Sequence, residues 1–145
     1  MKTSAKYIAI GLIGLATAFT SCTKDEIIPN TVTSTIDMRN SITQGVWEVE
    51  RFNDNGVDET QNYNELLFEF RPNGEAIAIG MGITYTGTWR VSGAETNNFM
   101  FINFGNEEKL KELNSGWRVT APVTSSILLE HAKDGKTKRL MFVRH

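Results

Sequence analysis

From Gly45 onward, apolar and polar side chains alternate in short segments that are separated by turn-forming residues. In one segment Leu66, Phe68 and Phe70 share a face, and a Pro-Asn-Gly turn at residues 72–74 follows. A period of two places successive side chains on opposite faces of a β-strand, so each segment has one apolar side to bury. The chain is therefore constrained to fold as a sheet whose apolar face is covered.

The first segment carries Trp47, Val49 and Arg51 at alternate positions, which predicts that these side chains share one face. Seven to eight such strands follow one another at spacings of about ten residues, and short turns join most of them. We predict an all-β fold, in which an antiparallel sheet is closed into a barrel or folded into a β-sandwich. A closed barrel would remove exposed sheet edges.

Residues 106–114 depart from the period of two. Leu110 and Leu113 are three positions apart, Asn106 is placed to cap a helix, and Gly116 is placed to end it. This pattern predicts one short helix near residues 106–114.

The N-terminal residues have the three zones of an export signal. Met1 to Lys6 contains two positive charges, Tyr7 to Phe19 is apolar, and the small residues Thr20 and Ser21 follow. An apolar run of this length fits the roughly 7–15 residues of a signal peptide and falls short of the ~20 that a membrane-spanning helix needs. We expect residues 1–21 to be removed as a signal peptide.

The sequence Phe-Thr-Ser-Cys at residues 19–22 resembles the lipobox of bacterial lipoproteins, with Phe19 where leucine is commoner. Cys22 is the only cysteine of the chain, so it has no partner for an intramolecular disulfide. The resemblance implies a lipid thioether on Cys22 and an acylated new N-terminus, whose buried CH₂ groups add about 0.8 kcal/mol each to membrane binding. A plain signal peptide with an incidental cysteine is the alternative.

We divide the mature chain into the acylated cysteine with a flexible polar tether, residues 22–40, and a β domain, residues 41–145. Residues 36–44 are ambiguous, since the four-residue spacing of Met38 and Ile42 fits one helical turn packed against the end of the domain.

The segment Thr-Lys-Asp-Glu at residues 23–26 resembles the export tag of Bacteroidetes surface lipoproteins. That resemblance implies a lipid-anchored location at the cell outer membrane, with display on the cell surface. A polar tether without targeting meaning has the same composition, so the leaflet stays open.

Charge argues against a nucleic-acid partner. Removal of residues 1–21 takes away Lys2 and Lys6 and no acid, which leaves 13 basic and 17 acidic side chains and a net charge of −4. Nucleic-acid binding calls for a basic surface instead. Residues 133–139 do hold four basic side chains around a glycine turn, which fits a solvated hairpin or a contact with an anionic partner.

Motifs for catalysis are missing from the sequence. The two histidines, His131 and His145, lie far from any second ligand at zinc spacing. No nucleophile elbow, phosphate-binding loop or dinucleotide fingerprint is present. We therefore expect no catalytic residue, no metal and no cofactor, and a protein that is not an enzyme.

Over residues 41–145 the chain resembles the small lipocalin-like domains of Bacteroidetes lipoproteins. The matching residues are Gly45-Val46-Trp47, the segment 68–74 with its Pro-Asn-Gly turn, the segment 87–91 around Trp89, and the strands within residues 117–144. The resemblance implies a small antiparallel up-and-down barrel of seven to eight strands, with a β-sandwich as the alternative. It also implies that Trp47 closes one end of this barrel beneath an arginine of the last strand, Arg144 or Arg139.

The resemblance also implies a cup for a small apolar ligand. Tyr85, Trp89 and Trp117 are the expected ligand-binding residues, because their polar tips suit a rim that is apolar on one side and wet on the other. Eight strands enclose only enough space for side chains or one small ligand. The alternative is therefore a filled core, in an envelope or surface protein that docks a protein or a glycan.

Overall fold

The computed structural model describes residues 34–94 and 97–145. The predicted signal peptide, Cys22 and residues 22–33 of the predicted tether lie outside the described residues. Among the helices of the described ranges, none is long and apolar enough to cross a membrane.

Strands dominate the described residues and are accompanied by one α-helix and two short 3₁₀ helices. In chain order the elements are α1 (Thr35–Ile42), β1 (Val46–Asp54), β2 (Val57–Asp58), η1 (Thr60–Tyr63), β3 (Leu67–Phe70), β4 (Glu75–Gly80), β5 (Ile83–Ala94), β6 (Asn97–Asn103), η2 (Lys111–Leu113), β7 (Ser115–Val119), β8 (Ser126–Lys133) and β9 (Lys136–Arg144).

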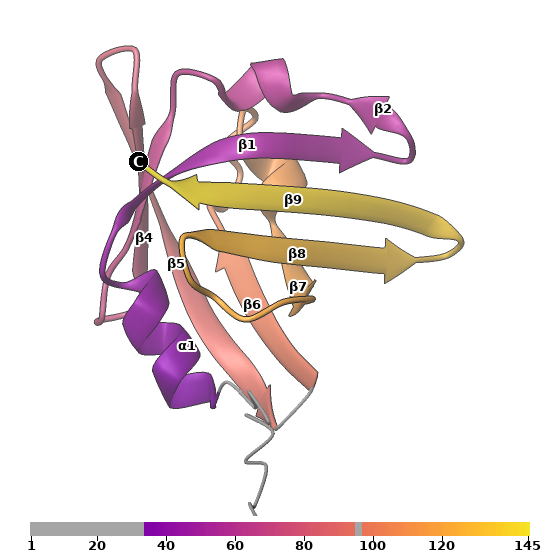
Figure 1. Ribbon diagram of the computed structural model, residues 1–145. Coiled ribbons are helices and arrows are strands. Elements are labelled where there is room, and N and C mark those ends of the chain that lie inside the picture. The colour runs from indigo at the N-terminus through magenta and orange to yellow at the C-terminus, as the bar shows by residue number, and fades with distance from the viewer. Residues whose placement is uncertain (1–33, 95–96) are drawn as a thin grey trace, which may run out of the picture. The chain divides into compact units, whose positions relative to one another are not determined.

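Eight of these strands close into an antiparallel barrel (Figure 1). Neighbours follow chain order from β3 to β9, and β9 returns to pair with β1 from Trp47↔Arg144 to Asp54↔Lys138. Pairing of β1 with β3 completes the ring, while the two-residue strand β2 extends the far end of β1. The predicted up-and-down barrel is confirmed over the sandwich, because one hydrogen-bonded ring replaces two facing sheets.

Strand β1 contains a β-bulge that changes which side chains face inward. Its register against β9 shifts between Val49 and Arg51. One extra residue moves every following side chain to the other face of the sheet. Phe52 is therefore buried, and Arg51 lies on the outside, which corrects the prediction that Arg51 shares a face with Trp47 and Val49.

Aromatic rings fill the barrel interior. Phe142 lies between two of them, with its ring centroid 5.2 Å from that of Phe68 and 5.7 Å from that of Phe70, both in edge-to-face geometry. The other large side chains that are fully buried include Trp47, Trp117, Tyr63, Phe52, Met38, Ile42, Leu66, Met100 and Leu110. The interior is thus occupied by side chains from every side of the ring.

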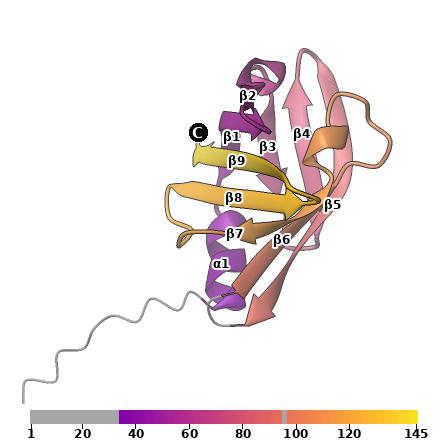
Figure 2. The same cartoon turned by 90° about the vertical axis from the view of Figure 1, so that its right-hand side faces the viewer.

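Helix α1 lies across one end of the barrel, away from the β4–β5 hairpin (Figure 2). Ser34 caps the helix, because its hydroxyl oxygen accepts a hydrogen bond from the backbone N–H of Asp37. Met38 and Ile42 are buried, which confirms the predicted helical turn. Residues 35–40, assigned above to the tether, belong to this helix, since burial of apolar side chains offsets the entropy lost on ordering them.

The short helix predicted near residues 106–114 is present only as the 3₁₀ helix η2, Lys111–Leu113. The side chain of Asn114 joins the two ends of the loop: its Oδ1 accepts from the N–H of Phe104, and its Nδ2 donates to the carbonyl of Gly105. This closure leaves the segment too compact for further turns of helix, and a short 3₁₀ turn is the usual form of such connectors.

Candidate functional site

At the α1 end of the barrel, Trp47 lies fully buried beneath Arg144. The Cζ atom of Arg144 is 5.0 Å from the centroid of the indole ring, within the range of a cation–π contact. Gly45 permits this approach, because a Cβ atom at that position would lie 2.9 Å from Arg144 Nε. Of the two arginines named from the resemblance, Arg144 rather than Arg139 lies over Trp47.

Hydrogen bonds tie this pair to the surrounding backbone. Trp47 Nε1 donates to the carbonyl of Ile42 at the end of α1, at 2.9 Å. Arg144 Nη2 donates to the carbonyls of Ser41 at 3.2 Å and Thr124 at 3.1 Å. The arrangement is a plug that joins α1, β1 and β9 and leaves the ring of Trp47 without access to solvent.

The predicted rim residues are not gathered around an opening. Trp89 is buried and its Nε1 donates to the carbonyl of Arg71, in the β3–β4 turn at the α1 end. Trp117 is buried and its Nε1 donates to the carbonyl of Leu113, at the opposite end. Tyr85 is half-buried and packs against the core from β5. Trp89 and Trp117 therefore lie at different ends of the barrel, as core residues.

The opposite end of the barrel, called the loop end, is covered by the residues between β6 and β7 and by η1. Leu110 and Leu113 from this loop have no exposed surface. Tyr63 of η1 is also buried and packs edge-on against Phe52, with ring centroids 5.3 Å apart. These side chains block access to the interior at the loop end as well.

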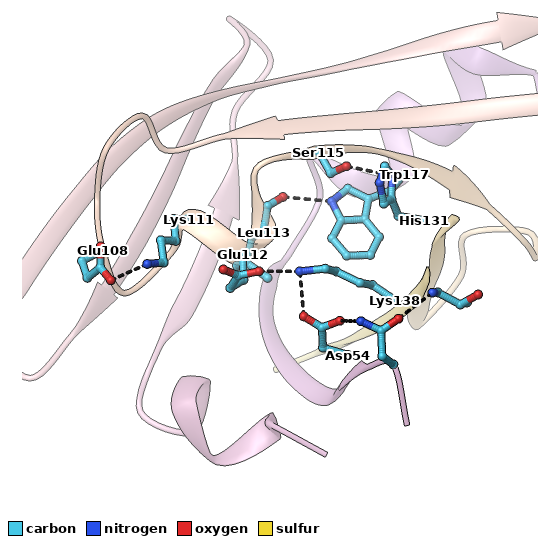
Figure 3. Close-up of polar contacts among 11 residues, drawn as sticks. Asp54, Glu108, Lys111, Glu112, Leu113, Ser115, Trp117, His131 and Lys138 are labelled. Carbon is cyan, nitrogen blue, oxygen red and sulfur yellow. Dashed lines mark hydrogen bonds and ion pairs between the residues drawn. The ribbon is translucent and has the colours of Figure 1, made fainter. Parts of the chain in front are cut away.

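A cluster of three charged side chains, the loop-end ion cluster, fastens this cover to the barrel (Figure 3). Lys138 Nζ lies 2.8 Å from Asp54 Oδ2 and also pairs with Glu112. Burial alone lowers the pKa of Lys138, but its hydrogen bonds to Asp54 and Glu112 outweigh that effect and raise the pKa above its ordinary value. The cluster thus joins η2 to the facing ends of β1 and β9.

Ser115 and His131 are in contact beside this cluster, and their geometry argues against Ser115 as a nucleophile activated by His131. Ser115 Oγ is 2.8 Å from His131 Nδ1, and the same nitrogen is 3.0 Å from the carbonyl oxygen of Gly116. That carbonyl can only accept, so a hydrogen bond to it needs a proton on Nδ1, and Nδ1 then cannot take a proton from Ser115. Within residues 34–94 and 97–145, no three side chains of metal-ligating type gather.

The outer face of the barrel carries a groove of about 530 Å³ over β7, β8, β9 and β1. Two neighbouring rows of outward-facing side chains line it. Thr120, Leu128, Met141 and Arg51 form one row, and Arg118, Glu130 and Arg139 form the other. We call this surface the arginine groove.

Glu130 lies at the centre of the arginine groove, between two guanidinium groups. It pairs with Arg118 across to β7, and its Oε1 is 3.4 Å from Arg139 Nε on β9. The hydrogen bond from Arg118 is the main cause that holds the pKa of Glu130 below its ordinary value. Three guanidinium groups and one carboxylate line the groove, so its lining carries a net positive charge although the whole chain has a net charge of −2.

Outside the arginine groove, Arg90 on β5 and Phe101 on β6 form a cation–π pair. The guanidinium of Arg90 lies 3.7 Å from the centroid of the Phe101 ring. Gly116 on β7 lies close to the same ring, since a Cβ atom at that position would come within 2.7 Å of Phe101 Cε1. The ring of Phe101 is therefore packed against Arg90 and Gly116.

No protein-family model matches the chain, and no curated protein matches it. Among solved structures, the chain is similar to a lipocalin-like protein from Bacteroides uniformis, with a TM-score of 0.48 and 16% identity, covering 72% of this chain and 99% of that chain. The assignment of the barrel rests on the strand pairing of this chain itself.

Proposed function

We propose that this protein is a lipid-anchored binding module of the cell envelope, not an enzyme, which docks a protein or a glycan through the outside of its barrel. The observation that carries the proposal is the filled interior, with a plug of side chains at each end. A small apolar ligand would have to displace core side chains such as Leu113 and Trp117, and each lost contact would weaken its binding. The arginine groove, in contrast, lies open on the surface.

The anchor in this proposal comes from the sequence. Cys22 follows an apolar run and two small residues, and the resemblance to a lipobox supports lipid on its sulfur. Export to the outer membrane and display on the cell surface follow from the resemblance of residues 23–26 to a surface-export tag. Such a location suits a module whose contacts are all on its outer face.

Ligand retention tests the proposed use of the outer surface. The purified full chain is incubated with an excess of fatty acids and with an envelope extract, and then examined by native mass spectrometry. We expect no fatty acid to remain bound, whereas a protein or glycan from the extract is retained. One fatty acid retained per barrel by the natively folded protein would contradict the proposal and restore the cup implied by the resemblance.

Fractionation tests the anchor separately. We expect the native protein to lack residues 1–21, to carry the mass of acyl chains on residue 22 and to sediment with membranes. Cys22→Ser should release it into the soluble fraction, whereas Ser21→Ala, which keeps a small residue before the cysteine, should not. A membrane-bound Cys22→Ser protein would show that lipid on this residue is not the anchor.

A further inference from the structure

We propose that the arginine groove binds an acidic, extended segment of a partner protein, with carboxylates on its arginines and apolar side chains on its floor. This proposal rests on the proposed function, because it names the surface and the class of partner. The occupant is argued from the charge and the shape of the groove.

Cross-strand pairing places the three arginines around one floor. Arg51 pairs with Met141 across β1 and β9, and Met141 pairs with Leu128 across β9 and β8. In the adjacent row, Glu130 lies between Arg118 and Arg139. The bulge in β1 is what brings Arg51 to this outer face, so the backbone itself is shaped to complete the cluster.

The guanidinium groups keep donors available for a second carboxylate. Arg118 uses Nη2 toward Glu130, and Arg139 uses Nε, out of the five N–H donors that each side chain has. Their side chains are 54% and 72% exposed, whereas Glu130 is only 22% exposed. Glu130 thus orients the two guanidinium groups from the protein side. A partner's carboxylate can approach them from the solvent side with bidentate geometry.

The floor of the groove favours a peptide over a nucleic acid. Leu128 and Met141 are aliphatic and half-buried, and methionine adapts its shape to varied apolar side chains. Bases of single-stranded nucleic acids are held mainly by stacking on aromatic side chains, and none of the described residues that line the groove is aromatic. An acidic peptide with interspersed apolar residues matches both rows, as in other arginine-cluster recognition of acidic motifs.

Closure of the barrel restricts how the segment is held. The strands that carry the groove are paired on both sides, so they offer no free edge for an added strand. Recognition must therefore come from side chains, and it must weaken with salt because the arginines are exposed to solvent.

Fluorescence anisotropy with a defined probe tests the groove. The probe is a labelled ten-residue peptide that alternates aspartate and leucine, and the control peptide has asparagine in place of aspartate. The full chain, kept in neutral detergent, should bind the acidic peptide and not the control. Arg118→Gln with Arg139→Gln should weaken binding at least tenfold, because the loss of even one charge-assisted contact of roughly 1.4 kcal/mol corresponds to that factor.

Two further variants separate a groove effect from a general charge effect. Arg71→Gln removes one charge from the β3–β4 side of the barrel and should leave binding unchanged. Glu130→Gln removes the competing carboxylate and should tighten binding by about threefold, the size typical of one partly screened charge. Increased salt should reverse the gain.

Unchanged affinity in the double arginine variant, or equal weakening by Arg71→Gln, would overturn the proposal. So would tighter binding of a single-stranded oligonucleotide than of the acidic peptide, or a second copy of the chain as the sole occupant in sedimentation. If a partner is captured from envelope extract but the double arginine variant captures it equally well, the groove is wrong and the proposed function stands. If fatty acid fills the interior, the proposed function fails whatever the peptide does.

Discussion

At the α1 end of the barrel, Trp47 is buried beneath Arg144 and bonded to the carbonyl of Ile42, whereas at the loop end Lys138 is held between Asp54 and Glu112. Both ends are closed, but by different chemistry. The first closure depends on apolar burial and on hydrogen bonds to carbonyl groups, which do not titrate. The second adds charges that respond to pH and to salt.

This difference indicates which end opens first. The plug at the α1 end joins α1 to the paired strands β1 and β9, so it separates only when the barrel unfolds. The cover at the loop end is a connection between strands with two buried leucines and one ion cluster, and such segments open locally at lower free energy than the core. If the interior is ever reached by a ligand, the loop end is the route.

Among the substitutions at the two ends, that of Trp47 is expected to destabilise the fold most. Trp47→Ala removes a fully buried indole from the α1 plug and should lower the free energy of unfolding by about 3–5 kcal/mol. Leu113→Ala at the loop end should cost less, about 2 kcal/mol, because the loop can relax into the space. Urea denaturation measures both, and a larger loss for Leu113→Ala would reverse the assignment of the stronger end.

The two helical segments show what the sequence could and could not predict. Both have two apolar residues at helical spacing, and α1 formed because Ser34 caps it and the barrel end accepts Met38 and Ile42. Residues 106–114 have the same local signals. There the fold overrode them, since Asn114 pins the loop ends together and allows only the turn Lys111–Leu113.

The candidate site shows a second limit of sequence reasoning. Alternation predicted the barrel and its inward-facing aromatics, but it assigned Arg51 to the wrong face because a bulge leaves no mark in a period of two. Arg118 and Arg139 meet through Glu130 across β7, β8 and β9, and only the closing pairing of β9 with β1 brings Arg51 to the same groove. The four basic residues within 133–139 were a signal for one part of it. Trp89 and Trp117, which were predicted for a rim, are core residues, because their ring N–H groups donate hydrogen bonds to backbone carbonyls within the fold.

Removal of the Lys138 charge tests whether the loop-end ion cluster holds the cover in place. Lys138→Met leaves Asp54 and Glu112 facing each other, and it should cost about 1–2 kcal/mol, between the values for exposed and buried ion pairs. Lys111→Met is the matched control, because Lys111 pairs with the well-exposed Glu108 and should cost very little. Hydrogen exchange should quicken in the loop that contains η2 in the first variant only. Equal protection in both variants would mean that the ion cluster does not hold the cover.

The smallest expected effect is a fall in the free energy of unfolding at alkaline pH. Its direction follows from two titrating groups at the loop end. Burial, together with the negative charges of Glu112, Glu59 and Asp54, raises the pKa of the Tyr63 phenol, and the carboxylates beside Lys138 raise the pKa of that lysine. A group whose pKa is higher in the folded state stabilises the fold fully below its unfolded pKa, about 10 for tyrosine, and loses that contribution as the pH rises toward the folded value.

We therefore expect the free energy of unfolding to fall between pH 9.5 and 11, by roughly 1 kcal/mol from Tyr63 alone, since one pH unit corresponds to about 1.4 kcal/mol per group. Tyr63→Phe should remove most of this fall, because phenylalanine keeps the edge-on packing against Phe52 and has no proton to lose. Denaturation at closely spaced pH values measures it. A Tyr63→Phe protein that loses stability as steeply as the parent would place the alkaline sensitivity outside the loop end and remove the chemical distinction between the two closures.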